Sequence, residues 1–165
     1  MAEKKLNFGC GIDVKEGWDN CDVQKGKNVI SFDFDTFPYP LKTGTYDLIY
    51  SRSVLQMLDR PDGVLNELWR IAKPGARIQL DVPYWHNKGA YNDIQTKHLF
   101  NEYSFIYFAE QKPCRIDTKK KFKIVRIFKR STIVGKFIPE FIKRKLDLFI
   151  GGLYSDIEVE FEVIK

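Results

Sequence analysis

The stretch Leu6-Asn7-Phe8-Gly9-Cys10-Gly11 is a short apolar run that ends in two closely spaced glycines. Glycine adopts backbone conformations that other residues avoid, so the pattern is typical of a β-strand that leads into a tight turn. Backbone amides beyond such a turn can receive polar or anionic groups of a ligand. The stretch predicts a first strand with a candidate binding loop at its carboxyl end, and an ordinary tight turn is the alternative.

More strands and one amphipathic helix are expected before Pro83. Apolar residues recur at helical spacing from Asp62 to Ala72, and Lys73-Pro74-Gly75 then stops the helix. Apolar and β-branched runs predict strands at 19–23, 28–34, 46–50 and 77–82. Strands that alternate with a helix in this way indicate an α/β domain with a largely parallel sheet.

The chain is irregular and aromatic from Pro83 to Gln111, and we interpret this part as an active-site loop with a short helix at 103–108. A strand is expected at 123–128, followed by a basic amphipathic helix at 138–150. Apolar residues then alternate strictly with glutamates from Asp156 to Ile164. This alternation predicts a half-solvated strand, which is typical of an edge hairpin.

The composition is that of an ordinary globular domain, since 44% of the 165 residues are hydrophobic and 30% are charged. These values exclude a disordered chain and a fibrous protein, and no apolar run approaches the ~20 residues of a membrane span. The first residues show no secretory signal, and three widely spaced cysteines give neither a disulfide framework nor a zinc pattern. We therefore expect one domain, no metal and a cytoplasmic location.

Basic residues concentrate in one segment of the chain. From Lys112 to Lys145, thirteen Lys or Arg residues accompany two acidic residues, a local balance of +11 in a chain whose net charge is +5. Such a segment suits an anionic partner, but a solvated basic face is the simpler interpretation. No recognition helix, zinc finger or RNA-binding signature accompanies the charge, which disfavours a nucleic-acid partner.

Two aspartates are placed to contact a nucleoside. Asp22 ends the second expected strand, where a carboxylate can accept hydrogen bonds from both hydroxyls of a ribose. Asp33 lies between Phe32 and Phe34, a combination of acceptor and aromatic walls that suits a purine. Val14 stands where a dinucleotide fingerprint has its third glycine. Adenosine without a pyrophosphate therefore fits better than a dinucleotide.

Five segments between residues 5 and 83 carry a family resemblance: LNFGCG, WDNCDV, FDFDTFPYP, TYDLIYSRSVLQML and LNELWRIAKPGARIQLDVP. In these segments the chain resembles class I S-adenosylmethionine-dependent methyltransferases, specifically the type 11 small-molecule group. A weaker run, DIQTKHLFNEYSFIYF, extends the resemblance to about residue 108. The chain is most similar to small methyltransferases met among sugar and cell-surface polysaccharide genes.

The resemblance implies a Rossmann-like, mostly parallel sheet of seven strands, with an antiparallel edge hairpin at the carboxyl end and helices on both faces. It implies a single methyltransferase domain over residues 1–165, with a cofactor half at about 1–83 and a substrate half at about 84–165. The implied cofactor is S-adenosylmethionine, and the partner is a small-molecule acceptor.

The resemblance also implies roles for individual residues. Residues 8–11 would line the methionine and ribose part of the cofactor, and Asp22 with the adjoining Val23 would hold the ribose. Asp33 would face the adenine amine, while Phe34 packs against the ring or presents its backbone amide. The remaining positions border the sulfonium and the substrate entrance. By number, the implied cofactor residues are Phe8, Gly9, Cys10, Gly11, Asp22, Val23, Asp33, Phe34, Ser51, Arg52 and Ser53.

Three departures from the family pattern stand out. Asn7 replaces the usual acidic residue before the first glycine, and Gln56-Met57 replaces a Glu-His pair. No helix is expected ahead of the first strand, which leaves the substrate side thinly covered. The basic helix at 138–150 or a second subunit is a candidate lid, so a homodimer stays open.

Methyl transfer from a sulfonium needs chiefly alignment and exclusion of water, so a general base is optional. His86 is our first candidate base because it follows a strand at the ligand edge of the sheet, and His98 is the second. A loop histidine without a chemical role is an equally good interpretation of His86. Tyr84, Trp85 and Asp93 are candidate acceptor contacts, with core closure as the alternative for the aromatic residues.

Three functions are compatible with these residues. The first is a methyltransferase that acts on oxygen or nitrogen of a small acceptor, glycosyl or phosphorylated. The second is a catalytically degenerate cofactor-binding module that works with a partner, which Asn7, Gln56 and the thin amino-terminal cover motivate. A nucleic-acid methyltransferase ranks last, because Ser51-Arg52-Ser53-Val54 bears no likeness to an Asn-Pro-Pro-Tyr motif.

Overall fold

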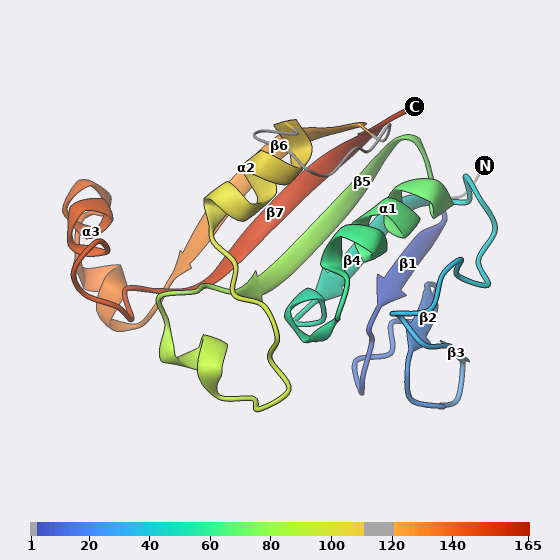
Figure 1. Cartoon of the computed structure of the whole chain (residues 1–165), viewed down its shortest axis with the longest axis horizontal. Helices are drawn as coiled ribbons and strands as arrows, with labels where there is room; N and C mark the ends of the chain where they lie inside the picture. Colours follow the sequence, from blue (N-terminus) through green and yellow to red (C-terminus); the bar gives the residue numbers. More distant parts are fainter. Residues whose placement is uncertain (1–2, 111–120) are drawn as a thin grey trace.

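The computed structural model describes residues 3–110 and 121–165, which form a seven-stranded sheet in the order β3-β2-β1-β4-β5-β7-β6 (Figure 1). The strands are β1 (Lys5–Phe8), β2 (Asp19–Asp22), β3 (Val29–Ser31), β4 (Tyr46–Arg52), β5 (Ala72–Pro83), β6 (Lys121–Ser131) and β7 (Tyr154–Ile164). The helices are α1 (Pro61–Ile71), α2 (Glu102–Glu110) and α3 (Glu140–Leu146), with 3-10 turns η1 (Leu55–Met57), η2 (Lys88–Tyr91) and η3 (Val134–Phe137).

Neighbouring strands from β1 to β5 pair in parallel, whereas β7 pairs antiparallel with both β5 and β6. The predicted Rossmann-like sheet with its antiparallel edge is confirmed. Within that edge, β7 lies between two strands and β6 forms the rim. The alternation of β7 is as expected, since Ile157, Val159, Phe161 and Val163 are buried and the intervening glutamates are half-buried.

One face of the sheet is apolar and carries both longer helices. The pairing register places Ile49, Ile78 and Phe161 side by side, and all three are fully buried. On α2, the ring of Phe105 lies 6.2 Å from that of Phe161. In Figure 1, α1 and α2 lie over the same side of the strands. The core therefore sits between this face and these two helices.

The opposite face is polar. The same register places Tyr50, Gln79 and Glu160 side by side there, none of them buried. Charged and polar side chains of this kind favour contact with water over burial in a core.

Several element boundaries differ from those expected. β5 begins at Ala72 because Gly75, at φ +75°, carries the strand through an irregular register instead of ending it. β3 stops at Ser31, before Asp33, whose carboxylate accepts hydrogen bonds from the Asp35 amide and the Thr36 hydroxyl and so forms a turn. The expected helix at 138–150 is shorter, since regular helix spans only α3.

The core makes one cysteine chemically inert. Cys21 on β2 is fully buried, and burial raises the pKa of its thiol to about 12. Only the thiolate reacts with alkylating agents. We expect Cys21 to resist iodoacetamide at pH 8 in the folded protein and to react at once in denaturant, as peptide mass spectrometry would show. Rapid labelling of Cys21 in the native protein would contradict the placement of β2.

Candidate functional site

The carboxyl ends of three adjacent strands form the candidate site. Phe8, the last residue of β1, pairs with Cys21 of β2 on one side and with Ser51 of β4 on the other. The segments that follow these strands are therefore brought together, as expected for an open α/β sheet, where ligands bind beyond the carboxyl ends. This edge collects the glycine loop, Asp22 and the segment Ser51–Ser53.

Two asparagines hold the loop at residues 9–18, which connects β1 to β2 without a helix. The Asn7 side-chain amide donates to the carbonyl oxygen of Asp13 at 2.7 Å and to Asn20 Oδ1 at 3.0 Å. Asn20 in turn bonds both backbone polar groups of Lys15. Both side chains are 3% exposed. Asn7, noted in the sequence as a departure from the family pattern, serves this loop.

The two glycines of the loop differ in what surrounds them. A Cβ on Gly9 would lie 2.1 Å from Val54 Cγ2, so Gly9 is required where the ends of β1 and β4 pack together. A Cβ on Gly11 would meet nothing within 4 Å. Both residues have positive φ, of +73° and +51°, which favours glycine. Gly11 thus leaves its backbone open to a ligand, whereas Gly9 is structural.

Asp22 is fixed beside this opening. Its Oδ2 accepts from the Gly11 amide at 2.7 Å, and its Oδ1 accepts from the Gln24 amide at 3.0 Å. Each carboxylate oxygen has a second lone pair, so the group can accept two further hydrogen bonds. A rigid carboxylate with free acceptor capacity, next to open backbone, fits the ribose end of the expected cofactor. Val23 follows with 55% of its surface exposed.

The expected purine pocket is only partly assembled. Asp33 is exposed, and its hydrogen bonds from Asp35 and Thr36 lower the pKa of its carboxyl. Phe34 is 2% exposed and stacks on Phe8 with ring centroids 4.1 Å apart. The Phe34 ring belongs to the core, as does the buried Phe8 ring. Of the two roles expected for Phe34 toward adenine, only the backbone role remains.

The segment after β4 is strained and linked to β5. Ser53 is a non-glycine residue at φ +54°, and its amide donates to the Asp81 carbonyl at 2.8 Å. Strained backbone of this kind concentrates at functional sites. Arg52 is exposed and lies 3.7 Å from the Asp81 carboxylate, while Ser51 is buried.

Asp81 is a residue of this edge that was not expected from the sequence. It is 5% exposed, and burial raises the pKa of its carboxyl, although Arg130 lies 3.2 Å away. In the sequence, the one feature that could have pointed to Asp81 is that it is an acidic residue between the apolar Leu80 and Val82, at the end of an expected strand. The pairing with Arg130 comes from a strand far along the chain and has no signal in the sequence.

Gln56 is a second buried polar residue near this edge of the sheet. Its side chain is 4% exposed and its Oε1 is buried without a hydrogen-bond partner among the described residues. An unpaired buried acceptor costs about 1–3 kcal/mol, so Gln56 does not stabilise η1 through its side-chain oxygen. The Gln56 carbonyl accepts from the amides of Lys97 and His98, which ties the second candidate histidine to η1.

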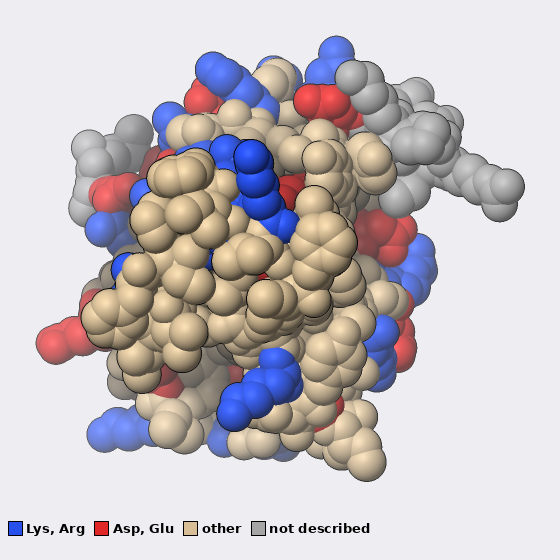
Figure 2. All heavy atoms as spheres, turned by 90° about the vertical axis from the view of Figure 1, so that its left-hand side faces the viewer, with Lys and Arg blue, Asp and Glu red and all other residues tan. Residues whose placement is uncertain are grey.

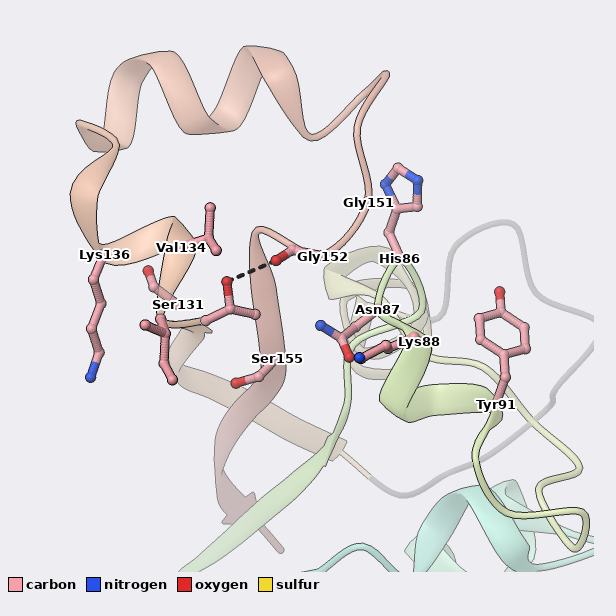
Figure 3. A pocket seen from close by; sticks show the side chains of 12 residues that line it. His86, Asn87, Lys88, Tyr91, Ser131, Val134, Lys136, Gly151, Gly152 and Ser155 are labelled. Atoms are coloured by element: carbon pink, nitrogen blue, oxygen red, sulfur yellow. Dashed lines mark hydrogen bonds between the residues drawn. The ribbon is translucent and has the colours of Figure 1, made fainter.

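His86 lies in an open groove of about 920 Å³ (Figure 3). Its Nδ1 is 2.8 Å from the Asp147 carbonyl oxygen, and its ring stacks on Trp85 at 4.7 Å between centroids. A carbonyl only accepts, so Nδ1 carries a proton and the Nε2 of a neutral ring is left as the base. Lys88, Tyr91, Ser155 and Lys136 also line this groove.

The other expected acceptor contacts have structural partners. Tyr84 is buried, and its hydroxyl donates to Asp147 Oδ2 at 2.7 Å. Burial, with this bond, raises the pKa of Tyr84. Asp93 is exposed and caps a turn by accepting from the Gln95 amide. In the described ranges, no group of three His, Cys, Asp or Glu residues is placed to hold a metal ion.

Three basic residues of the basic segment that lie on β6 form ion pairs with carboxylates. Arg126 pairs with Glu158, Arg130 with Asp156, Glu158 and Asp81, and Lys129 with Glu102. Residues 112–120 of that segment lie outside the described residues. Arg126, Lys129 and Arg130 are therefore held by carboxylates of the same protein and are not displayed as a free basic stripe for a polyanion.

Residues 4–80 match the family described as a methyltransferase domain. This range contains the glycine loop, Asp22, Asp33 and the segment Ser51–Ser53. No curated protein matches the chain in sequence.

Solved structures share the fold over nearly the whole chain. A SAM-dependent methyltransferase from Archaeoglobus fulgidus is 16% identical with a TM-score of 0.66, and the match covers 98% of this chain and 86% of that one. A methyltransferase from Mesorhizobium loti is 10% identical with a TM-score of 0.64, covering 96% and 90%. A Haloferax volcanii chain in complex with the Trm112 methyltransferase activator is 12% identical with a TM-score of 0.63, covering 99% and 84%. At these identities the likeness shows the fold.

Proposed function

We propose that the chain is a methyltransferase of the class I fold that methylates oxygen or nitrogen of a small acceptor, a proposal supported by the match of residues 4–80 to the methyltransferase domain and by the shared fold. The cofactor that this family implies is S-adenosylmethionine. The observation that carries the proposal is the meeting of open Gly11, fixed Asp22 and strained Ser53 at one edge of the sheet.

The residues at this edge fit that cofactor. Asp22 would accept the ribose hydroxyls, Asp33 the adenine amine, and the backbone at Gly11 would pass close to the methionine part. Ser51, Arg52 and Ser53 would border the sulfonium and the entrance of the acceptor. When bound, the cofactor supplies a methyl group on a good leaving group, so the protein's task is to align the acceptor and exclude water.

A base is provided by the groove beside β5. His86 has Nδ1 engaged by the Asp147 carbonyl, which leaves Nε2 to take a proton from a hydroxyl or ammonium acceptor. Lys88 and Lys136 on the groove walls give it a positive charge that favours a phosphorylated or otherwise anionic acceptor. His98 is the weaker candidate because its backbone is tied to Gln56. Trp85, 40% exposed, offers a face for a sugar or other ring.

The test has two parts. Calorimetric titration of the purified chain with S-adenosylmethionine and S-adenosylhomocysteine is expected to give micromolar binding, about −8 kcal/mol. Incubation with methyl-labelled cofactor and fractionated small-molecule extracts is then expected to label an acceptor. Binding without transfer would indicate a degenerate module or one that needs a partner, as in the Haloferax complex with an activator. No binding by a folded chain would contradict the proposal.

A histidine variant tests the base. His86→Gln is expected to lower turnover at least tenfold, because the glutamine amide cannot take the proton of the acceptor. Cofactor affinity should not change, because the groove lies beyond β5. His98→Gln tests the second candidate base in the same assay and is expected to lower turnover less than His86→Gln. Equal turnover by wild type and His86→Gln would mean that alignment alone suffices.

A further inference from the structure

Residues 133–152 form an excursion between β6 and β7 that projects from one end of the sheet. Its base is closed by Thr132, whose amide donates to the Leu153 carbonyl at 3.0 Å and whose hydroxyl donates to the Gly152 carbonyl at 2.7 Å. Figure 1 shows α3 of this excursion at the extreme end of the longest axis, beyond the strands. Residues 133–152 are called the tip below, and the residues on the surface of the tip determine what it can bind.

Two charged side chains of the tip, Lys143 of α3 and the adjoining Asp147, point inward. Lys143 is 4% exposed, and its Nζ lies 2.5 Å from Ser131 Oγ and 2.9 Å from a Glu140 oxygen. Asp147, 7% exposed, accepts from the Tyr84 hydroxyl. These groups attach the tip to the sheet by hydrogen bonds and ion pairs, in addition to the packing of Ile138 and Leu146 against the core.

Apart from Ile138 and Leu146, the large apolar side chains of the tip are exposed, which is unusual for a surface helix and its flanking turns. Phe137, Phe141 and Phe149 are 85%, 70% and 83% exposed. At roughly 150–250 Å² for each ring, they alone present roughly 350–600 Å², the size of the largest apolar patch on a typical soluble monomer. The tip surface, as we call it, also includes Ile133, Val134, Leu148 and Ile150.

Basic residues interrupt the tip surface. Lys136, Arg144 and Lys145 are exposed, and none makes an ion pair with an acidic residue in the described part of the chain. The exposed acid of the tip, Glu140, is engaged by Lys143 and by the Tyr154 hydroxyl. Figure 2 views this end of the molecule and shows mostly uncharged surface with Lys and Arg among it and acidic residues mainly at its margin.

We propose that the tip surface inserts its phenylalanines into the surface of an anionic lipid bilayer, with the three cations on the headgroups. Apolar rings combined with unpaired cations match the acyl boundary and the phosphates of such a bilayer. Self-association through the same surface would place these cations against their own copies, which charge repulsion disfavours. No helix of the described ranges is long and apolar enough to cross a bilayer, so the contact is peripheral.

Binding of the tip surface to a bilayer would bring the groove that holds His86 to the membrane. Ile133, Val134 and Lys136 belong both to the tip and to the lining of the groove that holds His86 (Figure 3). A molecule at the headgroup level would therefore meet the groove without leaving the interface. The lipid contact itself does not depend on the methyltransferase proposal, and its test requires no activity.

Vesicle sedimentation of the full chain is the test. The chain is expected to sediment with phosphatidylcholine vesicles containing about 30% phosphatidylglycerol, and much less with phosphatidylcholine alone or at about 0.5 M salt. The double variant Phe137→Ser/Phe149→Ser should lower binding at least tenfold, as should Lys136→Glu/Arg144→Glu. Ile94→Ser, at a site 99% exposed outside the tip, and Lys27→Glu are the matched controls and should bind as wild type.

A second measurement places the ring. The variant Phe149→Trp carries one more tryptophan than the wild-type chain. When anionic vesicles are added, the fluorescence of this extra tryptophan should shift to the blue, and brominated lipid should quench it. Failure of the wild-type chain to bind anionic vesicles, or equal binding by the phenylalanine variant, would overturn the proposal. A wild-type dimer in light scattering that Phe137→Ser/Phe149→Ser converts to monomer, without vesicle binding, would assign the tip surface to self-association.

Discussion

Asp22→Ala will weaken S-adenosylmethionine binding by about 30- to 100-fold, equivalent to about 2–3 kcal/mol. The substitution removes a carboxylate that the Gly11 and Gln24 amides hold in place and that has two free lone pairs toward the open side of the loop. Charged acceptors of this kind contribute more than neutral ones. Calorimetric titration with S-adenosylmethionine and S-adenosylhomocysteine measures the loss.

Two companion variants make the Asp22 result specific. Asp22→Asn keeps the shape but halves the acceptor capacity, so its affinity should lie between wild type and Asp22→Ala. Asp13→Ala removes another carboxylate of the same loop, 71% exposed and paired with Lys15, and should bind as wild type. Equal weakening by Asp13→Ala would mean that general loss of negative charge, or loosening of the loop, explains the effect.

Gly9→Ala will lower the free energy of unfolding by about 3 kcal/mol. A positive φ of +73° costs a residue with Cβ about 1–2 kcal/mol, and overpacking costs about 1–3 kcal/mol more. The overpacking arises because the new Cβ would lie 2.1 Å from Val54 Cγ2. Urea denaturation at constant m-value measures the change.

Gly17 and Val54 separate the two contributions. Gly17 has φ +75°, yet a Cβ there would meet nothing within 4 Å, so Gly17→Ala reports the cost of the backbone conformation alone. Adding Val54→Ala to Gly9→Ala should recover part of the loss by making room. If Gly9→Ala and Gly17→Ala destabilise equally, the close packing of the ends of β1 and β4 is not the reason for glycine at position 9.

Sequence pattern predicts well those helices, strands and turns that are determined by neighbouring residues in the chain. Leu6 to Gly11 was expected as a strand and turn, and Asp62 to Ala72 as a helix, because period and glycine placement report directly on the backbone. Both are confirmed within one or two residues. Periodicity also identified the buried side of β7. It carries no information on which strands are its neighbours, so its position between β5 and β6 could not be read.

Residues whose role depends on distant packing were harder to interpret. Phe34 stands beside a carboxylate and resembles a pocket wall, but its ring stacks on Phe8 from another strand. The helix expected at 138–150 shows the same limit, because Lys143 and Asp147 find partners on β6 and Tyr84 and turn inward.

The place of β7 in the sheet sets the order in which the fold can be completed on the ribosome. Arg77 of β5 pairs with Glu162 of β7, so this edge of β5 stays unpaired until residues made much later are available. β6 is synthesised before β7, which is its strand partner in the described sheet, so until β7 is made β6 is an unpaired strand. Charged side chains along it, such as Arg126 and Lys129, discourage pairing with another nascent chain during that interval.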